Sequence, residues 1–226
     1  MAKHLRCAIL DIDGTLVDSN DAHASAWMQA INEQGHQISF EKVRPLIGMG
    51  GDKVLPEVLG ISKDSPEGQV IGKRRKEIFF TKYLPTLHAF PQSKELLEHM
   101  YQQGLQLVVA TSAEPDELSA LLQLIGPHVS DLFTEETTSK DAPHSKPDPD
   151  VIHAALQRAH VQADESIMLG DTNYDIQAAL RSGVQTIAFR CGGWSDHDLQ
   201  KARAIYDDPA DLLTHYNSSL LVHEQG

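Results

Sequence analysis

Cysteine is scarce in this sequence, and long hydrophobic runs are absent. The two cysteines, Cys7 and Cys191, are too few for a disulfide framework, and Cys7 lies in an apolar run typical of the core. No segment approaches the roughly 20 apolar residues of a transmembrane helix. The short apolar run near the start leads directly into acidic residues, which is unlike a signal peptide. We therefore expect a cytoplasmic protein, in a reducing environment and without a membrane partner.

The chain also lacks a surplus of basic residues. It has 19 Lys and Arg against 32 Asp and Glu, for a net charge of −13. Nucleic acid is thereby disfavoured as a partner, since a phosphate backbone needs a basic surface. A small anionic substrate is not disfavoured, because a local positive site or a bound cation can attract it. The 226 residues, 41% of them hydrophobic, suffice for one sizeable core and a smaller second domain.

The hydrophobic pattern divides the chain into two parts. An apolar run at Leu5–Leu10 predicts a buried strand, and residues 19–87 are predicted to be helical throughout. From Pro91 onward, predicted strands alternate with predicted helices, which indicates a parallel sheet with helices on both faces. We predict a doubly wound α/β core formed by residues 1–18 and 88–226. A small helical cap domain, residues 19–87, would be inserted after the first strand.

Four polar clusters follow predicted strands or open predicted helices, and in such sheets ligands bind beyond the carboxyl ends of the strands. The first contains Asp11 and Asp13, directly after the first strand. Two carboxylates placed this close repel each other unless a cation lies between them. Mg²⁺ prefers oxygen ligands and suits phosphate substrates. The alternative for this pair alone is a turn rich in Asp and Gly.

The other three clusters each have an ordinary structural alternative. Thr111 and Ser112 follow a strand and could bind phosphate oxygens, or could merely cap the next helix. Lys146 lies among prolines before a helix and could neutralise phosphate, or could be a solvated lysine. Asp171 follows another strand as a possible third metal carboxylate, with Asp175 one helical turn on. The alternative is simple helix capping by Asp171 or Asn173.

Taken together, in this order, the four clusters resemble the haloacid dehalogenase-like hydrolase superfamily over essentially the whole chain. The helical insertion resembles the C1 cap of that superfamily. Residues 47–53 and 190–194 resemble its phosphoglycolate-phosphatase-like branch. One departure is Gln92, which stands where a glycine commonly follows the proline.

The resemblance implies a role for each matching residue. Asp11 would be the nucleophile that forms an aspartyl-phosphate, and Asp13 would protonate the leaving alcohol and then activate water. The residues implied to hold Mg²⁺ are Asp11, Asp13 (through its backbone carbonyl) and Asp171. Asp175 would orient a metal-bound water or Lys146. The residues implied to bind phosphate are Thr111, Ser112 and Lys146.

Asp13 narrows the reaction, because related dehalogenases lack the second aspartate and need no proton for their leaving group. The resemblance thus implies a Mg²⁺-dependent phosphatase acting on a small phosphorylated metabolite, as a monomer or weak homodimer. Two alternatives stay open: a phosphomutase of the β-phosphoglucomutase type, and a catalytically silent binding module on the same fold.

The substrate's other end is expected to be recognised by the cap. Gly50 and Lys53 belong to a glycine-rich stretch that lets the backbone approach a ligand, and Lys53 could pair with an anionic group. The alternative is a plain turn between two helices. His23, at the start of the cap, is a further candidate, although a partly buried polar residue between cap and core is the favoured interpretation.

Overall fold

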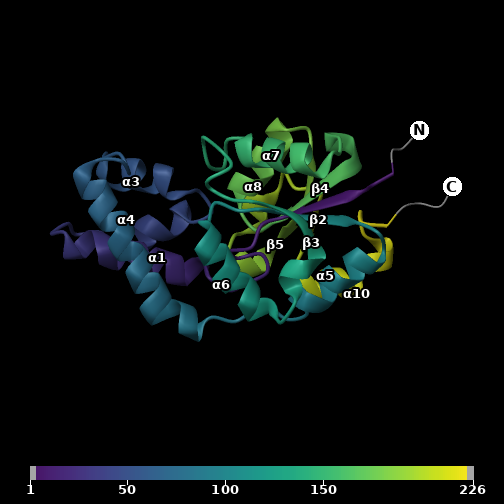
Figure 1. Ribbon diagram of the computed structural model, residues 1–226, viewed down its shortest axis with the longest axis horizontal. Helices are drawn as coiled ribbons and strands as arrows, with labels where there is room; N and C mark the ends of the chain where they lie inside the picture. The colour runs from purple at the N-terminus through teal and green to yellow at the C-terminus, as the bar shows by residue number, and fades with distance from the viewer. Residues whose placement is uncertain (1–3, 223–226) are drawn as a thin grey trace.

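One parallel six-stranded sheet forms the centre of the computed structural model, which describes residues 4–222. The strand order is β3-β2-β1-β4-β5-β6, and every neighbouring pair is parallel. The strands are β1 (Cys7–Leu10), β2 (Gln106–Ala110), β3 (Phe133–Thr137), β4 (Ser166–Gly170), β5 (Gln185–Phe189) and β6 (Ala204–Tyr206). The predicted doubly wound α/β fold is confirmed (Figure 1).

Helices cover both faces of this sheet, as the continuous apolar strands require. The helices of the sheet region are α5 (Ser93–Gln102), α6 (Pro115–Ile125), α7 (Asp150–Ala159), α8 (Asn173–Arg181), α9 (Asp196–Leu199) and α10 (Pro209–Thr214). Short 3₁₀ turns connect them at η4 (Val129–Leu132), η5 (Ala163–Glu165), η6 (Arg190–Gly192) and η7 (Tyr216–Ser218). In Figure 1, α7 and α8 lie above the sheet and α5 and α10 below it.

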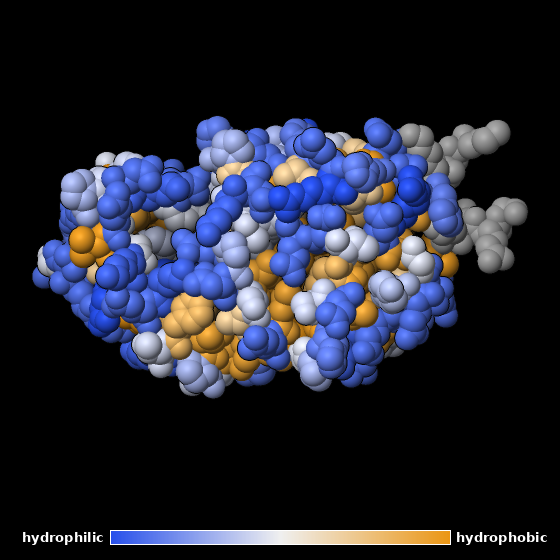
Figure 2. Space-filling view, viewed as in Figure 1, coloured by the Kyte–Doolittle hydropathy of each residue, from blue (hydrophilic) through white to orange (hydrophobic). Residues whose placement is uncertain are grey.

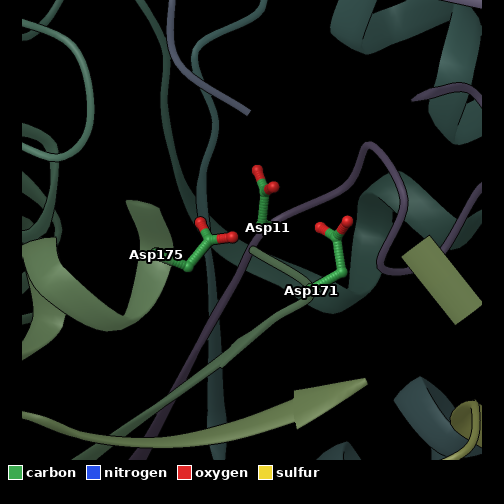
Figure 3. A group of neighbouring side chains, drawn as sticks. All are labelled: Asp11, Asp171 and Asp175. Carbon is green, nitrogen blue, oxygen red and sulfur yellow. The ribbon is translucent and has the colours of Figure 1, made fainter. Parts of the chain in front are cut away.

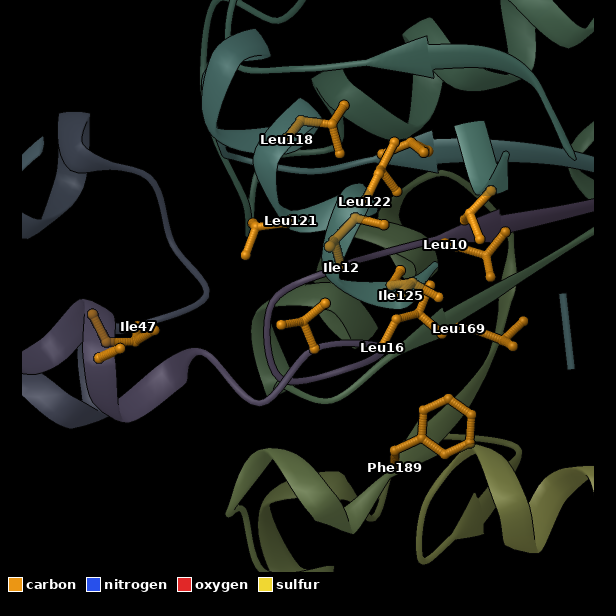
Figure 4. Packing of buried hydrophobic residues seen from close by; sticks show 14 of the residues in the cluster. Leu10, Ile12, Leu16, Ile47, Leu118, Leu121, Leu122, Ile125, Leu169 and Phe189 are labelled. Atoms are coloured by element: carbon orange, nitrogen blue, oxygen red, sulfur yellow. The ribbon is translucent and has the colours of Figure 1, made fainter. Parts of the chain in front are cut away.

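The side chains of β1 point alternately into two apolar layers, one on each face of the sheet. Cys7 and Ile9 pack with α7 and α8, whereas Ala8 and Leu10 pack with α5, α6 and α10. Successive residues of a strand point to opposite faces, so every position of this four-residue strand is buried. Figure 4 shows part of the second layer, in which Leu10 and Leu169 of the sheet belong to the same apolar cluster as Leu122 of α6. The core thus fixes β1 from both sides.

The inserted segment, residues 19–87, is helical, as predicted. It contains α1 (Asn20–Glu33), α2 (Phe40–Val43), η1 (Arg44–Leu46), α3 (Gly51–Leu59), α4 (Pro66–Ile78), the π-helix η2 (Phe79–Tyr83) and η3 (Leu84–Thr86). The start of α4 is set by Pro66 at its first position and by the Ser65 hydroxyl, which caps it by accepting from Gly68 N at 3.0 Å. In Figure 1 these helices lie together at one end of the molecule.

Two chain segments join the insert to the sheet, and they lie side by side. Phe90 N donates to the Leu16 carbonyl at 2.9 Å, and Asp18 N donates to the His88 carbonyl at 3.1 Å. Both crossings therefore occur at one point, close to the predicted boundaries at residues 18/19 and 87/88. The division into two domains at these boundaries stays a prediction. None of the helices in residues 4–222 is long and apolar enough to cross a membrane.

Candidate active site

Three of the four predicted clusters lie directly at the carboxyl ends of neighbouring strands. Asp11 follows β1, Thr111 follows β2 and Asp171 follows β4. Since β1 lies between β2 and β4, these three residues emerge at the same edge of the sheet. Asp11 is fixed there by its backbone, whose N–H donates to the Leu169 carbonyl at 2.9 Å. The fold therefore brings together residues 160 positions apart in the sequence.

Three buried carboxylates converge at this edge (Figure 3). Asp11, Asp171 and Asp175 each place an oxygen within 4.8 Å of the others. Burial, and secondarily the charge of Asp175, raises the pKa of Asp171 to about 7. Burial likewise raises the pKa of Asp11 well above its usual value, although Lys146 opposes this. A cluster of hard oxygen donors with this excess of negative charge fits a divalent cation.

Lys146 is the cation built into the cluster. Its side chain is fully buried, and Nζ lies 2.8 Å from Asp11 Oδ1 and 2.7 Å from Asp175 Oδ1. Burial acts to lower the pKa of Lys146, but the two carboxylates outweigh it and raise the pKa above its ordinary value. Lys146 is therefore an ammonium held against Asp11. The structural alternative predicted for this residue, a solvated lysine, is therefore wrong.

Asp171 is oriented by two residues to which the sequence assigned no role. Thr15 Oγ1 donates to Asp171 Oδ1 at 3.0 Å, and Asn20 Nδ2 donates to Oδ2 at 2.8 Å. Gly14 permits this packing: its φ is +72°, and a Cβ there would lie 2.3 Å from Asp171 Oδ2. Asn20 is the first residue of α1, so the insert itself contributes to the orientation of the carboxylate.

Asp175 has a capping role as well as its contact with Lys146. Its Oδ2 accepts from both the backbone N–H and the hydroxyl of Thr172, at 3.0 and 2.6 Å. Its other oxygen is the one that binds Lys146. Because a carboxylate has two oxygens, Asp175 makes both contacts at once, and its contact with Lys146 is the one predicted. The capping residue of α8 is Thr172, and not Asp171 or Asn173 as in the alternative.

The Asp13 carboxylate points away from the other three and toward the insert. Its Oδ1 accepts from Ser19 Oγ at 2.5 Å and contacts His23 Nε2 at 2.7 Å. Burial acts to raise the pKa of Asp13, but His23, together with Ser19, outweighs it and holds the pKa below its usual value. In this arrangement Asp13 is a carboxylate. Its side chain lies outside the cluster of Asp11, Asp171 and Asp175, which leaves only its backbone carbonyl for the metal role predicted above.

His23 links Asp13 to a buried ion pair between the insert and the sheet. Arg75 Nη2 donates to His23 Nδ1 at 2.7 Å, and arginine has no acceptor, so the Nε2 of His23 carries the proton that is donated to Asp13. Arg75 of α4 also binds Glu117 of α6 with two hydrogen bonds, at 2.8 and 3.0 Å. Phe79 stacks on the His23 ring at 4.2 Å. No periodicity or motif in the sequence indicates this network, because its members lie on three separate helices.

Thr111 and Ser112 offer hydroxyls on the other side of Asp11. Thr111 Oγ1 accepts from Ala113 N at 3.1 Å, which leaves its proton available. Ser112 Oγ is buried without a hydrogen-bond partner in the described part of the chain. A buried hydroxyl in this condition costs free energy unless a ligand pairs with it. Both residues line the cavity described next.

A cavity of about 400 Å³ lies between the insert and the sheet edge. Asp11, Asp13 and Ser112 line its floor, whereas Trp27 and residues of α4 belong to the insert. Volumes of this size are typical of small-molecule sites. The predicted cap candidates His23 and Gly50 both line this cavity.

Lys53 takes a different contact from the one predicted. Its Nζ forms an ion pair with Asp148, in the loop before α7, and Lys53 is not among the described residues that line the cavity. Gly50 N similarly donates to Ser145 Oγ at 3.0 Å. The stretch of residues 48–53 therefore docks the insert onto the sheet region, and its lysine is already paired there.

With the geometry established, comparisons with known proteins identify the family. The haloacid dehalogenase-like hydrolase family matches residues 8–189. The chain belongs to this family. Membership and hydrolase class were both predicted from the sequence, and both are confirmed.

Two curated relatives with different names and one solved structure show the likeness of this hydrolase to known proteins. A phosphoglycolate phosphatase of Vibrio parahaemolyticus is 28% identical over 197 residues, which cover 83% of this chain and 85% of that protein. The pyrophosphatase PpaX of Oceanobacillus iheyensis is 24% identical and covers 93% and 96% of the two chains. Among solved structures, a hydrolase from Pseudomonas syringae superposes with a TM-score of 0.86 at 26% identity, covering 94% of this chain and 98% of that one.

Proposed function

We propose that this hydrolase is a Mg²⁺-dependent phosphatase of small phosphorylated metabolites that forms an aspartyl-phosphate on Asp11. The observation that carries the proposal is the Asp11 carboxylate itself, held 2.8 Å from the Lys146 ammonium beside two further buried carboxylates. The phosphatase relatives support the same reaction class. The position of Asp11 at a strand end, facing the cavity, gives it access to a bound phosphate ester.

Mg²⁺ would be held by Asp11, Asp171 and the backbone carbonyl of Asp13, and would neutralise charge on the phosphoryl oxygens. Lys146 supplies a second positive charge against Asp11 and the phosphoryl group. Thr111 and Ser112 would donate hydroxyl hydrogen bonds to the remaining phosphoryl oxygens. Ser112 would thereby gain the partner it lacks.

In the first step, an Asp11 oxygen attacks phosphorus and the bond from phosphorus to the alcohol oxygen breaks. Asp13 gives its proton to the departing alkoxide. In the second step, Asp13 takes a proton from water, the water oxygen attacks phosphorus, and the bond to Asp11 breaks to release phosphate. The carboxylate form of Asp13 described above is the form needed for this second step.

The acid role in the first step requires Asp13 to take up a proton when substrate binds. The negative charges of a phosphate ester favour this, because a nearby like charge raises the pKa of a carboxyl group. His23 and Ser19 position the Asp13 side chain at the boundary between insert and sheet. The state of the insert and the protonation of Asp13 are thus coupled through these contacts.

The test is phosphate release from a panel of phosphorylated metabolites in the presence of Mg²⁺, with transfer to a second hydroxyl scored in the same assay. Asp11→Asn should abolish turnover and leave the fold intact, because the amide is a poor nucleophile of similar size. Near-normal phosphate release by Asp11→Asn would refute the mechanism. Net isomerisation in place of phosphate release would establish a mutase instead.

A further inference from the structure

The wall of the cavity formed by α4 carries positive charge that nothing in the described part of the chain balances. Four cationic side chains line the cavity: Lys63, Lys73, Arg75 and Lys76. Arg75 is paired with Glu117, and Lys76 with Glu114 and Asp116. Within residues 4–222, Lys63 and Lys73 have no ion pair or side-chain hydrogen bond.

These two lysines stand out in a chain with a net charge of −13. Most acidic residues that line the cavity already have partners: Glu117 and Glu114 bind the paired cations, and Asp52 accepts from the Ser145 hydroxyl. Lys63 and Lys73 are exposed, so their ammoniums stay hydrated until a ligand displaces that water. Their charges are therefore available to a ligand inside the cavity.

Next to Lys73 in α4, the cavity wall has an open notch at Gly72. This glycine lies in the interior of α4 and lines the cavity, and a Cβ built on it would meet no atom within 4 Å. Neither backbone geometry nor packing requires glycine here. A glycine in a helix interior is less favourable than alanine. Because Gly72 lines the cavity, the space that a side chain would occupy there is open to a ligand.

We propose that Lys63 and Lys73 bind a second anionic group of the substrate, and that the notch at Gly72 accommodates the substrate chain beside them. The inference rests on the proposed phosphatase function and specifies its substrate class. The substrate is a phosphate monoester that carries a second negative charge, on a carboxylate or on another phosphate. Recognition of that charge belongs to α4 and the loop before it, and not to the stretch of residues 48–53, whose lysine is paired with Asp148.

The test compares three substrates: 2-phosphoglycolate with its carboxylate, 1,3-propanediol bisphosphate with its second phosphate, and 2-hydroxyethyl phosphate with a neutral end. The wild-type enzyme should show a higher kcat/KM for at least one charged substrate than for the neutral one. Which of the two charged substrates is preferred distinguishes carboxylate from phosphate. Added salt should raise the KM of the charged substrate more than that of the neutral one, because exposed charges are screened.

Lys63→Gln and Lys73→Gln should each lower the charged-to-neutral ratio of kcat/KM by about fivefold, the effect expected of one solvent-accessible charge pair. Lys201→Gln removes an equal charge from an exposed residue outside the cavity lining and should leave the ratio unchanged. Gly72→Ala should keep or raise the Tm while raising the KM of the charged substrate. A raised KM at an unchanged or higher Tm would show that the added methyl group fills space needed by the substrate and does not destabilise the fold.

Equal kcat/KM for charged and neutral substrates would overturn the inference, as would a ratio that neither lysine variant changes. Failure of the proposed function looks different. In that case the wild-type enzyme would hydrolyse none of the three substrates, nor p-nitrophenyl phosphate.

Discussion

At the scale of single residues, the site separates two carboxylates that lie two positions apart in the chain. Asp11 faces Lys146, whereas Asp13 faces His23 and Ser19. Their environments push the two pKa values in opposite directions, upward for Asp11 and downward for Asp13. Groups separated in this way can take different roles in one reaction. Each role leads to a different kinetic signature.

Asp13→Asn should lower kcat by roughly 10²–10⁴-fold, because the amide can neither protonate the alcohol nor activate water. The loss should be smaller for p-nitrophenyl phosphate than for an alkyl phosphate when the first step limits the rate, since p-nitrophenolate leaves without a proton. Steady-state kinetics on both esters provides the measurement. Equal losses on the two esters would argue against the acid role of Asp13.

Sequence patterns predicted the positions of three residues at strand ends, because each follows a short apolar run typical of a buried strand. Asp11, Thr111 and Asp171 are in this group. The same patterns did not find Asn20 or Arg75, which are brought to the site by helix packing across long distances in the chain. They also offered Lys53 as a contact for an anionic group of the substrate, since a sequence does not reveal that this lysine pairs with Asp148.

At the scale of whole elements, α4 and α6 are joined by the buried pair Arg75–Glu117. The Glu117 side chain is 2% exposed, and its two oxygens receive both terminal nitrogens of Arg75. Lys76 adds exposed pairs with Glu114 and Asp116 at the same contact. Loss of a partner from the buried Arg75–Glu117 pair should lower the free energy of unfolding more than loss of an exposed pair, because only the buried pair is shielded from water.

Glu117→Ala should lower the free energy of unfolding by about 3 kcal/mol, since it leaves the Arg75 charge buried without its partner. Glu114→Ala removes an exposed carboxylate from the same contact and should cost less than about 1 kcal/mol. Urea denaturation of both variants gives the comparison. Similar losses of unfolding free energy in the two variants would mean that the buried pair contributes no more to stability than the exposed one.

The ion pair between Lys53 and Asp148 joins the insert to the sheet region at a second place, and its effect on catalysis can be measured. Lys53→Ala and Asp148→Ala should change kcat/KM by similar factors, and the double variant should be little worse than either single one, because both remove the same ion pair. The second pair of Asp148, with Arg181, is exposed and contributes little. Kinetics of the four proteins forms a double-mutant cycle. A large KM effect of Lys53→Ala alone would instead restore the original prediction that this lysine binds substrate.

At the scale of the whole molecule, the carboxylate cluster predicts that a bound cation raises the stability of the fold. Asp11, Asp171 and Asp175 place three acidic groups against one ammonium, that of Lys146, at the end of the sheet. Mg²⁺ bound to the native state alone would stabilise it by mass action. Figure 2 shows one face of the molecule, which is hydrophilic over much of its area and has hydrophobic patches below the centre of the view.

Excess chelator should stop phosphate release, and Mg²⁺ should restore it and raise the Tm. Ca²⁺ should restore activity poorly, because its larger and more variable coordination shell disturbs the alignment of the reacting groups. Asp171→Asn should lose most of the Mg²⁺-dependent shift in Tm, which separates binding from catalysis. Undiminished activity in excess chelator would exclude the metal.

The position of β1 has a consequence for how the chain folds. The strand that carries Asp11 is near the amino end of the sequence but lies between β2 and β4, which follow about 100 and 160 residues later. Its hydrogen-bonding edges therefore have no native partner while a ribosome is still making the first third of the protein. Pairings this distant in sequence form slowly. During synthesis, the reaction centre can assemble only after the segment through Asp175 has emerged.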